Sequence, residues 1–430
     1  MRALAVAVLL LATPAAASPQ IVVLEPSTPL TLGSVTFESG RQVAFSIGIG
    51  SAAFRGRHDP PDVAWTVSDR GPNIACTQAL AITGVPRERI CAAANNGRIY
   101  PVPAYAPTIY GLRLDPERGV FHVFDAIALK TADGRPIDGL LNPLTVATTE
   151  TPLDARGRVL AQNASAVDAE GIVRLADGTF WIGEENAPSI LHVAADGRIL
   201  MRIVPAGTGA DFAGAGYPVF EGLPALLARR FTNRGIESMA ISPDERFLYT
   251  MLQNPLANPD ARAYQQAKNT RLLKIERATL RVVGQYVYQL DDPQSFRKDP
   301  SNRQSDPRIS ELTALGTDRL LVLERTDGTT KLYEVDLRAG ATDILGSRWD
   351  DPATRPTLEQ SNDLVGAGIT PLGKRLVFDS ADHPQAPTKL EGVAVLPDGA
   401  LFLINDDDFG ITGERTVGLI VRGLDIRTTD

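Results

Sequence analysis

A short pattern of apolar and polar positions recurs four times along this chain. Each copy begins with a glutamate, continues with mostly apolar residues, carries an aspartate seven positions later and ends in a second apolar run. Apolar runs on both sides of an aspartate-centred turn predict two antiparallel strands joined as a β-hairpin. The copies begin at Glu170, Glu237, Glu311 and Glu391, and their turn aspartates are Asp177, Asp244, Asp318 and Asp398.

The spacing of the copies predicts the architecture. Successive glutamates are 67, 74 and 80 residues apart. Because a hairpin fills only part of each interval, every unit has room for two more strands, such as those expected at 271–277 and 331–337. Four-stranded antiparallel units repeated around an axis form a β-propeller. We therefore expect an all-β protein of this class.

The number of blades depends on the N-terminal part of the chain. Four units start at the repeated glutamates, and the segment Phe45–Val159 is long enough for two degenerate units. We therefore predict six blades, with seven as the alternative. The strand at Ile21–Val23 is expected to complete the last unit, which is short. A pair of β-sandwich domains is the competing architecture, but it gives no reason for the same glutamate to open each hairpin.

Helix is predicted to be sparse. Leu223–Phe231 is expected to form a short helix with Pro224 in its first turn. Asn258–Lys268 is expected either to form a helix with Asn258 as N-cap or to be a loop. The polar, proline-containing segment Asp291–Arg308 is predicted to be an exposed loop.

The N-terminus has the pattern of an export signal. Arg2 supplies a positive charge, residues 3–12 are apolar, and the small residues Ala15–Ala17 precede Ser18. This pattern predicts a signal peptide cleaved after Ala17, and it is too short for a membrane anchor. An uncleaved anchor is the alternative. Residues 1–17 are thus predicted to be a signal peptide and residues 18–430 a single propeller domain, in the periplasm or secreted, with no membrane insertion.

The composition indicates which partners the protein can have and whether its cysteines are oxidised. The 430 residues contain 43 Lys+Arg and 51 Asp+Glu, for a net charge of −8. A general nucleic-acid-binding protein needs a basic surface, so we expect no nucleic-acid partner. Cys76 and Cys91 are the two cysteines of the sequence. An oxidising compartment favours a disulfide between them, with two buried free thiols as the alternative.

In a propeller, the repeated glutamates would collect at one mouth of the central channel. Two carboxylates about 6 Å apart repel by about 3 kcal/mol at an effective dielectric of about 20, so the group needs protons, arginines or a metal ion. Ligand sets made only of oxygen suit Ca²⁺. The predicted metal ligands are Asp69, Glu170, Glu184, Glu237, Glu311, Glu391 and Asp406.

Other residues complete this hypothesis. Glu170, Glu391 and His383 are candidates for proton transfer at the same mouth. Basic side chains would hold the charge of a phosphate group; the candidates are Arg70, Arg234, Arg325 and Lys389. The alternative is structural: a glutamate at a strand start can accept backbone N–H bonds and hold neighbouring blades together, with the basic residues as its ion-pair partners.

Five segments of the chain resemble the exported bacterial phytase-like (esterase-like, phytase-related) family, from about Ile47 to Phe409. They are residues 65–73, 168–188, 234–256, 309–325 and 390–410. The resemblance implies a β-propeller that hydrolyses phosphoesters or other esters, with calcium dependence inferred from propeller phytases. Gln253 and Asn254 stand where another segment carries acids, so a metal ligand there would be an amide.

Together these observations predict a periplasmic, calcium-dependent ester hydrolase acting on a small-molecule phosphate ester. The acidic net charge favours a small phosphoester over a highly phosphorylated one. Two other classes stay open: a non-catalytic propeller that binds a ligand or a protein, and a propeller lactonase or carboxylesterase.

Overall fold

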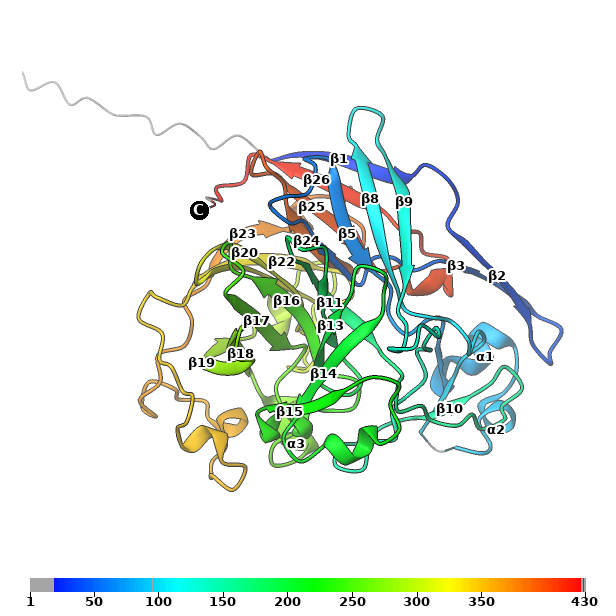
Figure 1. Cartoon of the computed structure of the whole chain (residues 1–430), viewed down its shortest axis with the longest axis horizontal. Helices are drawn as coiled ribbons and strands as arrows, with labels where there is room; N and C mark the ends of the chain where they lie inside the picture. The colour runs from blue at the N-terminus through cyan, green and yellow to red at the C-terminus, as the bar shows by residue number, and fades with distance from the viewer. Residues whose placement is uncertain (1–18, 95, 427, 429–430) are drawn as a thin grey trace, which may run out of the picture.

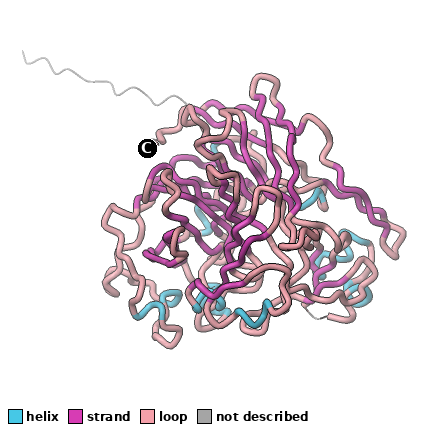
Figure 2. Tube along the Cα trace, viewed as in Figure 1, coloured by secondary structure: helices cyan, strands magenta, loops and turns pink. Residues whose placement is uncertain are grey.

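The computed structural model describes residues 19–94, 96–426 and 428. The predicted signal peptide lies outside the described residues. Strands dominate the chain and the helices are short (Figure 2). The N-terminal blade consists of β4 (Ala52–Phe54), β5 (Val63–Val67), β8 (Thr108–Asp115) and β9 (Val120–Ala128). The second consists of β11 (Ala169–Arg174), β12 (Phe180–Glu184), β13 (Ser189–Val193) and β14 (Ile199–Pro205), with β15 (Val219–Leu223) added at its edge.

Three further blades follow along the chain (Figure 1). The third consists of β16 (Ile236–Ile241), β17 (Phe247–Leu252), β18 (Asn269–Glu276) and β19 (Arg281–Gln289). The fourth consists of β20 (Arg308–Gly316), β21 (Arg319–Arg325), β22 (Thr330–Asp336) and β23 (Arg375–Asp379). The last consists of β24 (Leu390–Val395), β25 (Leu401–Asn405), β26 (Gly418–Arg422) and β1 (Gln20–Pro26).

The blades close into a ring. Each inner strand, in the order β4, β11, β16, β20 and β24, contacts the next, and β24 contacts β4 again. Apolar side chains fill the space between blades; for example, Trp65 of β5 meets Phe180 of β12 edge-on at 5.5 Å between ring centroids. The all-β propeller prediction is confirmed, and the described residues form five blades. The predicted count of six is therefore wrong.

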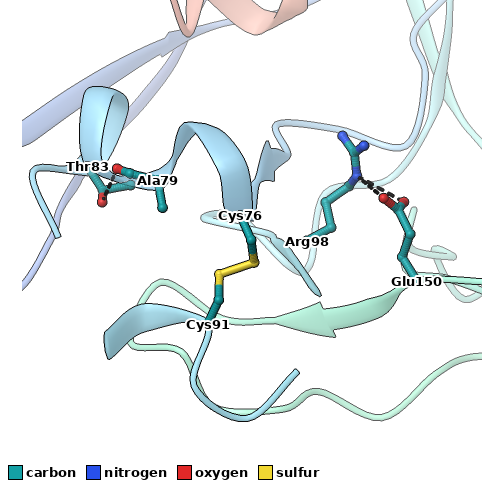
Figure 3. The surroundings of a disulfide bond; sticks show 6 residues. All are labelled: Cys76, Ala79, Thr83, Cys91, Arg98 and Glu150. Carbon is teal, nitrogen blue, oxygen red and sulfur yellow. Dashed lines mark hydrogen bonds and ion pairs between the residues drawn. A yellow bond between two sulfur atoms is a disulfide. The ribbon is translucent and has the colours of Figure 1, made fainter. Parts of the chain in front are cut away.

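The error arose in the segment Phe45–Val159. It holds one blade and an insertion rather than two blades. The insertion contains a small sheet of β6 (Ile74–Ala75), β7 (Gly97–Ile99) and β10 (Thr151–Leu153), with η1 (Cys76–Gln78), α1 (Ala79–Thr83) and α2 (Arg87–Ile90). Cys76 and Cys91 form the predicted disulfide within it, close to the Arg98–Glu150 ion pair (Figure 3). The length of the segment suggested blades, but its apolar residues pack around this disulfide.

The N-terminal strand closes the ring. β1 pairs antiparallel with β26, so that Ile21 lies opposite Val421, which confirms the predicted completion of the last blade. Glu25 and Pro26 of β1 also pair in parallel with β9 of the first blade. The two ends of the chain are thus tied into one sheet, and the next strands, β2 (Thr31–Thr36) and β3 (Gln42–Ser46), form a projecting hairpin (Figure 1).

The helices follow the sequence expectations with two corrections. η3 (Ala225–Arg229) confirms a short helix in the first segment, but Leu223 ends β15 and Pro224 is the N-cap rather than part of the first turn. α3 (Ala261–Gln266) confirms the second, but its N-cap is Asp260, whose carboxylate accepts the backbone N–H groups of Arg262 and Ala263. Asn258 lies before this turn and is not the N-cap. The other short helical turns are η2 (Gly209–Phe212), η4 (Pro293–Ser295), η5 (Arg348–Asp350), η6 (Leu358–Gln360), η7 (Ser380–Asp382) and η8 (Asp408–Gly410). Among the described residues, every helix is too short and too polar to cross a bilayer.

The predicted loop at 291–308 is irregular apart from η4, and Asp291 anchors its start. The Asp291 carboxylate contacts the ammonium groups of Lys331 at 2.9 Å and Lys374 at 2.5 Å and accepts a hydrogen bond from Tyr333. Burial alone would raise the pKa of Asp291, but the charge of Lys374 and these hydrogen bonds lower it to about 2. The two ion pairs of Asp291 therefore link the loop to β22 through Lys331 and to the segment before β23 through Lys374.

Replacing Asp291 with asparagine is expected to destabilise the protein by about 2 kcal/mol at pH 7. Because the folded pKa lies below the unfolded value, this stabilisation is complete above about pH 4 and is lost as the pH falls toward 2. Urea unfolding of both proteins between pH 7 and pH 3 measures the difference. Asp382→Asn, at an exposed ion pair with Arg297, is the control and should change stability by less than about 1 kcal/mol. A difference that stays constant with pH would contradict the explanation.

Candidate functional site

Irregular pairing turns three of the repeated glutamates out of their strands. In three blades, the pairing register between the first two strands shifts by a residue. The shifts lie between Ala169 and Ile172, between Ile236 and Ser238, and between Leu390 and Gly392. The residues inside these shifts include Glu170, Glu237 and Glu391. A β-bulge leaves its extra residue outside the ladder and redirects its side chain. The bulges therefore explain how glutamates from three blades reach one place.

These glutamates meet two aspartates in what we call the acidic cluster: Asp69, Asp168, Glu170, Glu237 and Glu391. One carboxylate oxygen from each of Glu170, Glu237 and Glu391 lies within 4.8 Å of the other two. The same holds for Asp69, Asp168 and Glu170. Asp69 is half-buried and the other four are buried. The two groups share Glu170, and each could hold a metal ion.

Burial and mutual repulsion oppose ionisation of the cluster. Burial raises the pKa of Glu170 well above its usual value, and the charges of Glu237 and Asp168 raise it further. Burial also raises the pKa of Asp69, with Asp168 and Asp406 adding to the shift. Carboxylates in such surroundings need protons or a cation. A divalent cation would remove the repulsion and keep the groups ionised.

Several buried acceptor atoms at this mouth lack a donor. Oε2 of Glu237, Oε1 of Gln253 and Oδ1 of Asn254 have no hydrogen-bond partner, and Oδ2 of Asp168 has only an ion pair with Arg70 at 3.3 Å. An unpartnered buried acceptor is costly, whereas carboxylate and amide oxygens are the ligands that Ca²⁺ prefers. These oxygen atoms therefore fit a calcium ion as ligands. They include the amides of Gln253 and Asn254, which follow the second strand of the third blade.

Glu311, the fourth repeated glutamate, lies differently. In β20 the extra residue is Ser310, because Ile309 pairs with Glu324 and Glu311 pairs with Leu323. The Glu311 carboxylate accepts the backbone N–H groups of Leu312 at 2.9 Å, Ala53 at 3.2 Å and Met239 at 3.3 Å. These contacts join three blades. Glu311 thus makes the structural contact that the sequence analysis gave as the alternative.

Two other predicted ligands also have protein partners. Glu184 is fully buried 2.9 Å from Arg202 and accepts the backbone N–H groups of Asp168 and Ala187. This ion pair places it within the second blade, outside the acidic cluster. Asp406 is buried at the edge of the cluster, where its carboxylate contacts Lys389 at 2.8 Å.

The predicted phosphate-binding residues surround the cluster. Arg325 donates to Glu391, and Arg70 lies 3.3 Å from Asp168. That ion pair is made by Nη1 of Arg70, which also lies 3.7 Å from Glu150, whereas its Nε has no hydrogen-bond partner. Arg234 contacts Glu185 at 3.4 Å. These three arginines and Lys389 offset part of the negative charge.

His383 has a different environment. Its ring stacks on Phe378 with 5.0 Å between centroids, and its backbone N–H donates to Ser380. Within the described part of the chain, His383 makes no hydrogen bond, ion pair or ring contact with the acidic cluster. The sequence analysis missed Asp168 and Glu185, although both lie in the segment 168–188. The signal was their position, since Asp168 precedes the bulge at Glu170 and Glu185 follows the end of β12.

A cavity of about 210 Å³ lies beside Asp69. The insertion supplies Asn73 and Arg98 to its wall, and the loop after β25 supplies Phe409. Arg98 is fixed by Glu150 at 2.9 Å and by Asn73 at 2.6 Å. Asp408 and Phe409 both have positive φ, at 47° and 55°, which costs energy for residues other than glycine. The cavity therefore has a fixed polar wall on one side and a strained loop on the other.

The fold and this mouth define the class: a β-propeller with a buried acidic site on its axis. A family model described as "Phytase-like: Esterase-like activity of phytase" matches residues 57–409. The chain belongs to this phytase-like family.

One curated relative is an uncharacterised secreted protein of Arthroderma benhamiae. It is 27% identical over 290 residues, which cover 58% of this chain and 56% of the relative. The match thus spans little more than half of the relative's length.

Solved structures show weak likeness. The RRP9 WD40 repeats are 9% identical, with coverage of 94% of this chain and 97% of that one, at a TM-score of 0.35. A putative 6-phosphogluconolactonase from Bacteroides uniformis is 11% identical, with coverage of 90% and 89%, at a TM-score of 0.33. The Dos1 propeller is 9% identical, with coverage of 92% and 82%, at a TM-score of 0.32.

Proposed function

We propose that this protein is an exported, calcium-dependent hydrolase of small phosphate esters and that the reaction takes place at the acidic cluster. Two sets of three carboxylates that share Glu170 are the observation that carries the proposal, together with the buried acceptor atoms that lack donors. Membership of the phytase-like family supports ester hydrolysis. The disulfide and the secreted relative support export to the periplasm or the outside of the cell.

In this proposal the metal ligands come from four different blades. Glu237 and Glu391 complete one metal position with Glu170, and Asp69 and Asp168 complete the other. Calcium bound there would neutralise phosphoryl charge and lower the pKa of a water molecule. Arg325 holds Glu391 in place, and Lys389 does the same for Asp406.

The substrate would reach this site through the cavity beside Asp69. Asp69 belongs to the acidic cluster and also lines the cavity, so it is the carboxylate placed to accept a proton from the attacking water. Arg70, whose Nε has no hydrogen-bond partner, lies beside the cluster and would bind the phosphate. The small volume of the cavity and its single lining arginine, Arg98, favour a substrate with one phosphate group.

A panel of esters tests the proposal. We expect the purified protein to hydrolyse a phosphate monoester such as p-nitrophenyl phosphate in the presence of calcium, and to lose at least about 100-fold in rate after EDTA treatment. Calcium should restore the rate. Hydrolysis of p-nitrophenyl acetate or a lactone instead would assign a carboxylesterase or lactonase. Absence of turnover on all three, with a melting temperature that still rises with calcium, would assign a non-catalytic binding protein.

A further inference from the structure

A second cavity, larger than the one beside Asp69, lies at the other end of the channel. Its volume is about 480 Å³. The inner strands start at the acidic cluster and end at this cavity, so it opens at the opposite mouth. Ester hydrolysis at the acidic cluster makes no use of it.

The floor of this cavity is apolar. Every blade contributes one buried side chain from the end of its inner strand. They are Phe54, Leu175, Ile241, Leu315 and Leu396. The rest of the lining is largely polar, so these side chains form an apolar patch within a polar cavity. A concave site that combines an apolar patch with a few polar groups is typical of sites for small organic molecules.

One wall of the cavity is cationic. Arg55 and His58 lie in the loop after β4, and Arg174 ends β11. The Arg55 guanidinium donates to the carbonyl oxygens of Asp59 at 2.8 Å and Pro60 at 3.4 Å. These neutral partners fix the side chain, and the nearby Asp59 carboxylate offsets part of its charge.

Arg174 strengthens this wall. It contacts the Asp59 carboxylate at 2.7 Å and lies over the Trp65 ring at 4.8 Å, and its buried Nε has no hydrogen-bond partner. Asp59 therefore offsets part of the charge of both arginines, while Arg57 and Arg277 add further positive charge to the lining. The adjacent third blade contributes Asp244 and Glu245, which accept hydrogen bonds from the Ser242 hydroxyl and from the backbone N–H of Ala176.

We propose that this cavity binds an organic anion with an apolar body, such as a medium-chain carboxylate. The carboxylate would bind Arg55, with the positive charge of Arg174 beside it, and the apolar body would cover the floor. Guanidinium groups recognise carboxylates through charge-assisted hydrogen bonds. The site is independent of the proposed hydrolysis, because it lies at the other end of the channel.

Calorimetric titration of the intact protein with octanoate tests the proposal, with octan-1-ol as the uncharged comparison. We expect one octanoate per chain and much weaker binding of octan-1-ol. Arg55→Gln should weaken octanoate binding at least about tenfold, because a hydrogen bond to a charged group is lost. Arg113→Gln is the matched control, since this exposed arginine pairs with Asp62 outside the cavity.

A second variant tests the space inside the cavity separately from the charge of Arg55. Ala314 lines the cavity and is only half-buried, so Ala314→Trp should fill the floor and abolish binding while Arg55 is retained. Unchanged melting temperatures would show that both variants fold. The proposal is overturned if octanoate does not bind the wild type, if octan-1-ol binds as tightly, or if Arg55→Gln binds octanoate as the wild type does.

Discussion

Glu170→Gln is expected to weaken calcium binding and phosphoester hydrolysis by at least about 100-fold. Glu170 is the carboxylate shared by both groups of potential ligands, so its replacement removes an anionic ligand from each. Changes to residues that merely orient metal ligands already cost 10–100-fold in affinity. Isothermal titration with calcium and steady-state kinetics measure the two losses.

The same variant should behave in the opposite way without calcium. Because burial and the neighbouring carboxylates already disfavour the charged form of Glu170, the neutral glutamine should leave the calcium-free protein as stable as the wild type or more stable. With calcium, the wild type should melt at a higher temperature than the variant. Binding should also strengthen as the pH rises, because calcium competes with protons for these carboxylates.

Glu311→Gln is the matched control at the equivalent position of the repeat. Its carboxylate accepts three backbone N–H groups and belongs to neither of the two ligand groups. Calcium affinity should therefore change by less than about threefold, whatever happens to stability. Equal losses of calcium affinity in both variants would favour a ring of four glutamates over the shared-Glu170 arrangement. Unchanged affinity and activity in Glu170→Gln would remove the proposed site.

Arg202→Met is expected to lower the free energy of unfolding by about 3–5 kcal/mol, because it leaves the charge of Glu184 buried without its partner. Both side chains have zero exposure, and the pair is 2.9 Å apart. Arg202 also donates to Ser189 at 2.8 Å and to the carbonyl oxygen of Ala166 at 2.9 Å. Burial raises the pKa of Glu184 to about 7 even with Arg202 present.

A double variant distinguishes the lost ion pair from lost packing. Arg202→Met/Glu184→Gln removes both charges and should recover part of the stability lost in Arg202→Met. Arg198→Met, which removes an exposed pair with Asp196, should cost less than about 1 kcal/mol. Denaturant unfolding of the four proteins gives the comparison. A double variant less stable than Arg202→Met would show that the hydrogen bonds of Arg202, rather than the charge of Glu184, dominate.

The local pattern of the sequence determined the hairpins, the all-β propeller class and the closing strand. Each depends on features recorded within a few residues: apolar runs, an Asp-centred turn and the shortness of the last unit. The disulfide was also predictable, because the chain has two cysteines and an N-terminal pattern that predicts export. The family followed from five segments that cover most of the domain.

Only the tertiary structure decided the blade count and the membership of the acidic cluster. The insertion around Cys76 and Cys91 has the length of a blade, and only its packing shows that it forms none. Glu311 has the same position in the repeat as Glu170, yet the bulge of β20 falls on Ser310. A bulge depends on how neighbouring blades pack and hydrogen-bond across the axis, and this information lies in residues hundreds of positions apart rather than in any single hairpin.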